Sequence, residues 1–281
     1  MNQQLPAQTQ HADSSAGAKT SYWQADLGYL SNSVYLGRKD SVRLPYLTPS
    51  VSYHNKSGLY MSGGLWYLPA AGDHRIDMGY VEAGYSFSVH QFEAQVSATK
   101  YFYSEESTNV NANVKAGLDL YTAYDWDFLT PSAELTLNFS KQTDYILTLG
   151  LEHSFYAGDH ITITPSVFMN AGTQNAYNSY YQERKFAAVR KKAKARNMPY
   201  VIGSNVQNAA AYKTLDYEGS LPINYTLHRF TFNITPTVAL PVNPANIQYT
   251  VKSPTGNVHT TTYREAIQNS FYWSTGVTFT F

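Results

Sequence analysis

Eight carboxylates of this chain stand at alternating positions beside apolar residues, where a β-strand would turn all of them to its polar side. They are Asp26, Glu82, Glu93, Asp119, Glu134, Glu152, Asp216 and Glu218, and Lys115 is the one basic residue that the same alternation places there. Carboxylates around a water-filled space attract cations and repel anions. These residues therefore suggest selection of solutes by charge, although a wet interior also accepts polar residues that have no function.

A second charged set is a basic cluster between positions 184 and 196. It contains Arg184, Lys185, Arg190, Lys191, Lys192, Lys194 and Arg196. Strong helix formers concentrate in the same stretch. Because a cationic helix above an anionic cavity has an electrostatic partner, we expect this segment to fold inward as a plug or constriction. Two alternatives stay open: an outward arm that binds lipopolysaccharide phosphates or a partner, and a merely solvated loop.

The residue patterns of common enzymes are missing. Gly-x-Ser-x-Gly, His-Glu-x-x-His and phosphate-cradling glycine loops do not occur, and the eight histidines lack the spacing of metal ligands. The absence of cysteine excludes thiolate metal sites and disulfides. We therefore predict no catalytic residue, no metal and no cofactor, and nucleic acid is not an expected partner.

The elements that position these residues follow from a period of two, which is the period of β-strands. Apolar residues alternate within residues 23–29, 47–53, 59–67, 81–89, 92–98, 110–120, 129–139, 145–155, 161–169, 215–225, 230–240 and 271–281. Each of these twelve segments offers one side without charge. Tight turns near residues 56, 90, 126, 158 and 228 alternate with longer loops, as in a barrel with short periplasmic turns and long external loops.

The last segment shows Phe271, Trp273, Val277, Phe279 and Phe281 on one side. It resembles the final strand of Gram-negative outer-membrane β-barrels, in which the terminal aromatic residue is part of the signal read by the barrel assembly machinery. The resemblance implies an all-β fold: a closed, antiparallel, twelve-stranded transmembrane barrel in the bacterial outer membrane. It further implies Phe281 as the assembly signal, lipid and lipopolysaccharide as surroundings, and a monomer.

Composition divides the chain into two regions. Residues 1–20 are polar and without periodicity, which predicts a disordered tail, and they lack the basic and apolar stretches of a secretory signal. Residues 21–281 are predicted to form the barrel, with a long basic loop at 172–212. Because no run of about 18 apolar residues occurs, transmembrane helices are excluded. A soluble all-β protein with a buried core is the alternative fold.

For function, we predict a channel or gated passage for small solutes, with an acidic lumen and the basic loop as its plug. One alternative is a closed barrel that serves as a partner-binding or structural subunit of the envelope. Another is an outer-membrane lipid-modifying enzyme, since the chain resembles the outer-membrane phospholipase A class in length and strand number. That class needs Ser and His together on the lipid face, whereas the outward His153 has Leu151 and Phe155 as same-face neighbours. We therefore do not expect an enzyme.

Overall fold

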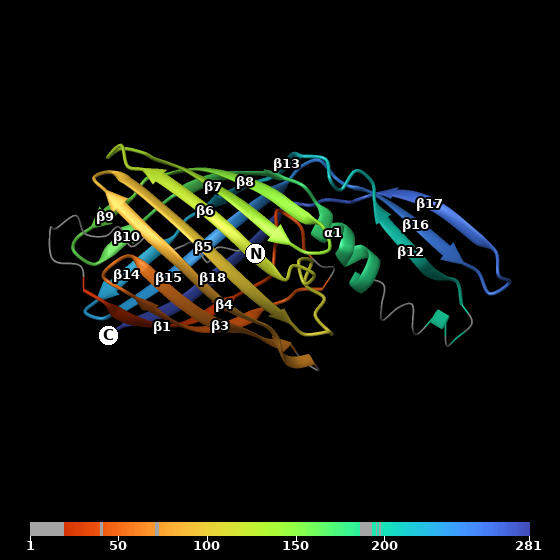
Figure 1. Ribbon diagram of the computed structural model, residues 1–281, viewed down its shortest axis with the longest axis horizontal. Coiled ribbons are helices and arrows are strands. Elements are labelled where there is room, and N and C mark those ends of the chain that lie inside the picture. The colour runs from red at the N-terminus through yellow and green to blue at the C-terminus, as the bar shows by residue number, and fades with distance from the viewer. Residues whose placement is uncertain (1–19, 40–41, 71–72, 186–192, 195, 197) are drawn as a thin grey trace.

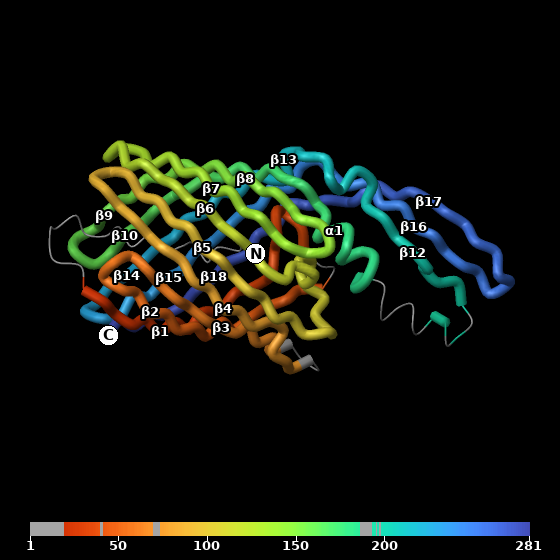
Figure 2. The backbone as a smooth tube through the Cα atoms, viewed as in Figure 1, coloured from red at the N-terminus to blue at the C-terminus, as the bar shows by residue number. Residues whose placement is uncertain are grey.

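A computed structural model describes residues 20–39, 42–70, 73–185, 193–194, 196 and 198–281. Its main body is an antiparallel sheet that closes on itself into a barrel, and the strands are tilted relative to the long axis (Figures 1 and 2). The tail predicted for residues 1–20 lies outside the described residues, apart from Thr20.

The wall consists of strands β1 (Tyr22–Leu30), β2 (Tyr46–His54), β3 (Leu59–Ala70), β4 (Asp73–Val89), β5 (Phe92–Tyr103), β6 (Ala116–Tyr124), β7 (Thr130–Phe139), β8 (Thr143–Glu152), β9 (Phe155–Ala157), β10 (Ile161–Ile163), β11 (Ser166–Gly172), β13 (Lys213–Ser220), β14 (Ile223–Leu227), β15 (Phe230–Pro241) and β18 (Ser270–Thr280). Strands β9, β10 and β14 continue β8, β11 and β13 after short interruptions, so the ring has twelve wall positions. Pairing of β1 with β18, and of β13 with β15, completes the ring. The predicted closed twelve-stranded antiparallel barrel is confirmed.

Proline causes two of the three interruptions. Pro165 separates β10 from β11, and Pro222 separates β13 from β14. Proline has no backbone N–H to donate to the ladder. Its carbonyl still accepts, since His153 N donates to Pro165 O at 3.3 Å and Thr164 N donates to Pro222 O at 2.9 Å. Backbone hydrogen bonds to the neighbouring strands therefore continue at both prolines.

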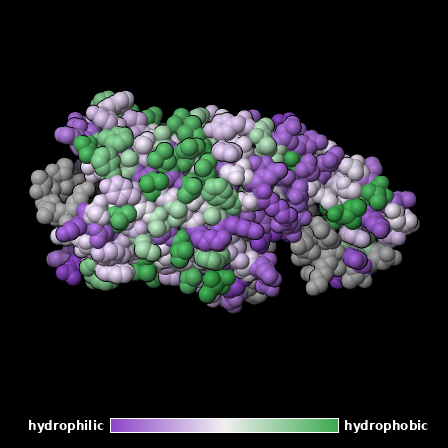
Figure 3. Space-filling model, in the orientation of Figure 1, coloured by the Kyte–Doolittle hydropathy of each residue, from purple (hydrophilic) through white to green (hydrophobic). Residues whose placement is uncertain are grey.

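The outer side of the wall is apolar. Exposed side chains at alternating positions include Leu27, Val51, Val81, Val96, Leu120, Leu135, Leu149, Val167, Phe232 and Val238. The space-filling view shows hydrophobic residues spread over the barrel portion of the molecule (Figure 3). Water would not tolerate so large an apolar surface, whereas hydrocarbon does, and closure leaves no unpaired edge strand for lipid to meet.

A charge on this outer wall should be strongly destabilising. Val96 is 49% exposed and is flanked by Tyr85 on β4 and Leu120 on β6. We expect Val96→Arg to lower the free energy of unfolding in lipid bilayers by about 2 to 4 kcal/mol, because the guanidinium would enter hydrocarbon. Denaturant titration of the refolded protein measures the loss. The matched change at the adjacent inward position, Gln95→Arg, should have a much smaller effect; equal losses would contradict the orientation.

The sixth predicted segment was wrong at its beginning. Val110, Ala112 and Val114 were expected on the outer wall, but they are buried and precede β6, which starts at Ala116. The asparagines between them favour turns: Asn111 N donates to Asn109 Oδ1, and Val114 N donates to Asn111 O. Such local bonds compete with a strand ladder, so alternation here marks a folded loop.

Both long connections after β11 contribute to a smaller unit beyond the end of the barrel. Strands β12 (Tyr200–Val206), β16 (Asn246–Lys252) and β17 (Val258–Arg264) form a separate sheet in the order β12-β16-β17. Helix α1 (Asn175–Tyr180) and the π-helical turn η1 (Tyr181–Lys185) lie at the junction of this sheet and the barrel (Figure 1). Within the described part of the chain, no helix has the length and apolarity needed to span a membrane.

Candidate functional site

The carboxylates predicted for the polar side of the strands lie on the face of the wall opposite to the exposed apolar residues. Asp26 accepts a hydrogen bond from Thr278 Oγ1 at 2.5 Å. Glu82 accepts one from the hydroxyl of Tyr60 at 2.6 Å. These partners come from neighbouring strands, so the carboxylates are held against the inner surface of the wall.

Two further acids come from β6 and β7. Asp119 accepts a hydrogen bond from Thr136 Oγ1 at 2.7 Å. Glu134 is buried and stands opposite Tyr121 in the register. Asp119 and Glu134 are therefore diagonal neighbours, which typically lie about 7 to 8 Å apart. At such a distance the two negative charges add to one local field.

The remaining predicted wall residues differ in their surroundings. Glu93 and Glu152 are half-buried, and together with Glu134 they act electrostatically on Tyr121. Lys115 is exposed and lies just before β6 begins. The interior therefore gathers negative charge around one part of the wall.

Asp216 and Glu218 lie on β13 near the end of the barrel that carries the long loops. Asp216 is completely buried opposite Asn170 on β11. Glu218 accepts a hydrogen bond from the hydroxyl of Tyr272 at 3.4 Å. The side chains of Glu218 and Asn170 act on the Asp216 carboxyl more strongly than the positive charge of Arg38 does.

Two loops meet across the opening at this end, which we call the mouth. Loop 31–45, of which residues 40–41 lie outside the described part, follows β1, and its Tyr35 hydroxyl accepts a hydrogen bond at 2.9 Å from Asn138 on β7, at the opposite side of the ring. Loop 104–115 joins β5 to β6, and Asn109 of this loop donates to Ser33 Oγ at 2.9 Å. The two loops therefore cross the mouth and hold each other there.

Apolar side chains pack beneath and around these loops. One buried cluster contains Leu30, Leu44, Tyr46, Trp66, Leu68, Met78, Tyr101, Val114 and Ala176. A second contains Tyr35, Leu36, Val110, Ile146, Tyr177, Tyr180, Tyr181, Val206, Ala209, Leu215, Ala245 and Ile247. Because both clusters mix loop residues with wall residues, burial of apolar surface holds the loops in the mouth.

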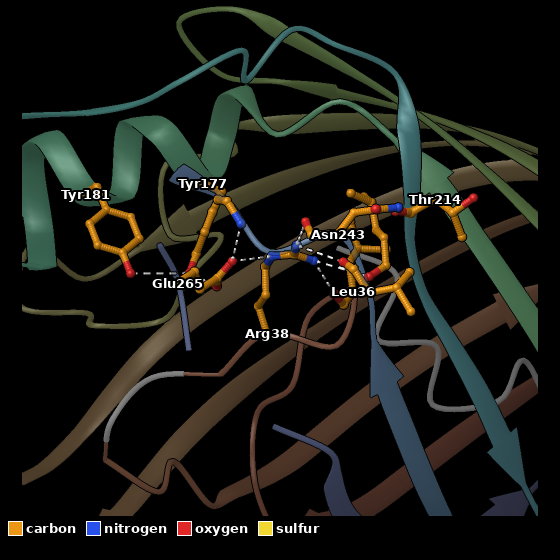
Figure 4. A network of polar contacts seen from close by, with 10 residues as sticks. Leu36, Arg38, Tyr177, Tyr181, Thr214, Asn243 and Glu265 are labelled. Atoms are coloured by element: carbon orange, nitrogen blue, oxygen red, sulfur yellow. Dashed lines mark hydrogen bonds and ion pairs between the residues drawn. The ribbon is translucent and has the colours of Figure 1, made fainter. Parts of the chain in front are cut away.

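Arg38 lies at the centre of the polar contacts of the mouth (Figure 4). Its side chain is 3% exposed. The guanidinium donates to the carbonyl oxygen of Leu36 at 2.9 Å and to that of Asn243 at 3.3 Å. Longer bonds of 3.5 Å reach the carbonyl oxygens of Leu215 and Val242. One side chain thus ties loop 31–45 to the ends of β13 and β15.

Glu265, between β17 and β18, is the charge partner of Arg38. Its Oε2 lies 3.5 Å from Arg38 Nε and accepts a hydrogen bond from Ala245 N at 2.9 Å. Its Oε1 accepts a hydrogen bond from the hydroxyl of Tyr177 in α1 at 2.5 Å. Burial and the carboxylate of Glu265 raise the pKa of Tyr177 well above its ordinary value, so this phenol stays protonated and donates. We call Arg38, Tyr177 and Glu265 the mouth latch.

The basic cluster begins close to the mouth. Arg184 in η1 donates to Asn113 Oδ1 at 2.9 Å and to the carbonyl oxygen of Ser107 at 2.8 Å. It is therefore anchored on loop 104–115. The ammonium group of Lys185 lies 5.9 Å from the ring centroid of Tyr180. Arg184 thus binds loop 104–115, whereas Lys185 contacts a ring of its own helical segment.

The rest of the basic cluster is less informative. Lys194 and Arg196 are exposed. Arg190, Lys191 and Lys192 lie outside the described residues. A plug made by the whole cluster stays a prediction, and loops 31–45 and 104–115 also lie at the mouth.

Sequence reasoning missed the latch and the crossing loops. Arg38 and Glu265 are far apart in the sequence, and no motif surrounds either of them. Loop 31–45 contains Ser31, Asn32 and Ser33 in succession, which is the composition of an ordinary turn. The apolar residues Val34 and Leu36 were a weak signal for a buried loop. Apolar residues at alternating positions outside a strand can indicate a loop that is buried on one side.

The histidine considered for catalysis has an aromatic neighbour. The ring of His153 meets the ring of Phe155 edge-on with 4.4 Å between centroids. The adjacent Ser154 hydroxyl is 3.0 Å from Thr164 Oγ1. These contacts give His153 a structural role in the bend between β8 and β9.

Phe281, the predicted assembly signal, lies at the seam of the barrel. Trp23 N donates to Phe281 O at 2.8 Å, and Phe281 N donates to Trp23 O at 2.9 Å. These bonds extend the pairing between the first and last strands by one further residue pair. Recognition by the assembly machinery stays a prediction.

Comparison with solved structures identifies similar folds. A structure described as "KdgM porin" has a TM-score of 0.50 at 10% sequence identity, covering 92% of this chain and 99% of that one. Two others score lower: "KdgM porin in complex with disordered oligogalacturonate" at 0.49 with 10% identity, and "NanC porin structure in rhombohedral crystal form" at 0.47 with 11% identity. Each of these two similarities covers 92% of this chain. The first covers 99% and the second 98% of the other protein's chain. No family model matches the chain, and no curated protein matches it in sequence.

At this level of identity the similarity concerns the fold. The chain shares a closed antiparallel barrel fold with the KdgM porin structure. Together with the apolar outer wall, this fold bears out the prediction of an outer-membrane-type β-barrel and agrees with the predicted localisation.

Proposed function

We propose that this protein is a non-enzymatic outer-membrane channel for small solutes that prefers cations over anions. The observation that carries the proposal is a porin-type barrel whose inner wall bears the carboxylates of Asp26, Glu82, Asp119 and Glu134. Fixed negative charge on a low-dielectric wall raises the local concentration of cations. Solute width and charge would then set what passes.

We further propose that the passage is gated at its mouth. The latch and the two apolar clusters favour a mouth that is closed most of the time. Loops 31–45 and 104–115 are the moving parts in this proposal, because they connect wall strands and belong to no strand themselves. Conduction then requires that the latch releases.

Planar lipid bilayers provide the test. In a salt gradient, we expect the purified protein to conduct in brief openings. The reversal potential should have the sign that preferred permeation of cations produces. Unselective or anion-selective openings would contradict the carboxylate wall. If neither the natural protein nor a variant without the latch conducts, the channel proposal fails, and the closed partner-binding barrel takes its place.

A further inference from the structure

The sheet beyond the mouth presents an unusual polar surface. The two segments that build it, residues 198–212 and 243–264, contain no Asp or Glu, although the whole chain has as many acidic as basic residues. The neighbouring acid Glu265 is engaged in the latch. The sheet is therefore a part of the protein with positive charge and hydrogen-bond donors but no carboxylate.

The register assigns its residues to two faces. One face carries Ile247, Val206 and Ser204, which are buried against the junction with α1 and η1. Ser204 Oγ donates to the carbonyl oxygen of Tyr181 at 2.8 Å, which fixes that side of the sheet. No helix or strand of the described residues covers the opposite face, which is the one available for a partner.

This open face carries rows of amides and hydroxyls between two cations, and Tyr200 and Val258 share the row of Lys252 at one end. Asn205, Gln248 and Thr262 form one row, and Thr250 and Thr260 belong to the next, with their hydroxyls 3.3 Å apart. We call it the donor face.

Lys252 and Arg264 mark its two ends, and both are exposed. Arg264 pairs with Asn246, six residues before Lys252 on β16. At the rise of a strand, the two cations are about 20 Å apart along the sheet.

From this arrangement we propose that the donor face binds the phosphorylated core saccharide of lipopolysaccharide. The apolar wall fixes the membrane level, and the sheet projects past the mouth on the side of the long loops, where saccharide surrounds an outer-membrane barrel (Figure 1). Lysine and arginine bind phosphate, and amide and hydroxyl groups bind sugar hydroxyls. The absence of carboxylates removes repulsion of an anionic chain. The site is independent of whether the barrel conducts.

Binding of isolated core oligosaccharide to the detergent-solubilised full chain tests this proposal, because removal of lipid A eliminates contacts with the apolar wall. We expect salt-dependent binding of the phosphorylated oligosaccharide and at least about tenfold weaker binding after enzymatic or chemical dephosphorylation. The double variant Lys252→Gln/Arg264→Gln should show a similar loss. Both side chains are exposed, so the variant should keep its fold, which strand content by circular dichroism verifies.

The matched control is Lys56→Gln/Arg229→Gln, which removes the same charge from exposed turns at the opposite end of the barrel. It should bind like the natural protein. Equal binding of both oligosaccharides, equal weakening by both double variants, or no binding at all would overturn the proposal. Binding of an acidic protein in place of either oligosaccharide would overturn it as well.

Discussion

Replacing Arg38 with methionine is expected to convert brief openings into a largely open channel. The substitution keeps an unbranched apolar stem but removes the guanidinium, and with it four bonds to carbonyl oxygens and the ion pair with Glu265. Loss of one partner leaves the other charge buried without compensation, which typically costs about 3 to 5 kcal/mol. Each change of about 1.4 kcal/mol is a factor of ten in an equilibrium constant. The ratio of closed to open mouths should therefore fall by about two orders of magnitude or more.

Single-channel recording measures this change as open probability. The control is Lys39→Met, in which the neighbouring exposed residue of the same loop loses its charge without disturbing the latch. Its open probability should match that of the natural protein. Glu265→Gln should give an intermediate effect, because the amide oxygen still accepts from one donor of the pair Tyr177 and Ala245. An Arg38→Met protein that folds as a barrel yet opens no more often would contradict the latch.

The second large effect concerns charge selectivity. We expect the triple variant Glu82→Gln/Asp119→Asn/Glu134→Gln to lose most of its cation preference, with the cation-to-anion permeability ratio falling about tenfold toward unity. Glu82 and Asp119 act on each other electrostatically, and Glu134 is the diagonal neighbour of Asp119, so the three charges form one field. Conductance should change less than selectivity, because the substitutions preserve side-chain volume.

Reversal potentials in a salt gradient measure the ratio. The triple variant Asp125→Asn/Asp127→Asn/Asp159→Asn removes the same charge from the tight connections between β6 and β7 and between β9 and β10, away from the mouth. It should keep the selectivity of the natural protein. If both triple variants shift the reversal potential equally, net charge and not the inner wall determines selectivity.

The barrel could be predicted because lipid imposes a strict rule on each strand separately. Leu118 and Leu120 must face hydrocarbon, so the intervening Asp119 must face inward, whatever the rest of the chain does. The same rule fails outside the membrane. Val110, Ala112 and Val114 alternate in the same way but face the packed mouth, because apolar surface can be buried by protein as well as by lipid.

The mouth could not be predicted for a different reason. Arg38 and Glu265 are meaningful only once loop 31–45 has crossed the ring, and that crossing depends on contacts such as Tyr35 with Asn138. Such contacts join segments that are distant in the sequence, and they produce no periodic pattern of residue types. Strands β12, β16 and β17 were missed because each of them requires the others as partners.

The most direct test of the central claim, a carboxylate-lined passage behind a latched mouth, is chemical modification of a single cysteine in the lumen. The chain contains no cysteine, and Ser62 is half-buried on the inner wall opposite Glu82. In Ser62→Cys, a cationic thiosulfonate reagent added from outside should react about tenfold faster than an anionic reagent of the same size. Adding Arg38→Met should accelerate both reactions. Equal rates for the two reagents, or rates unchanged by Arg38→Met, would contradict the account.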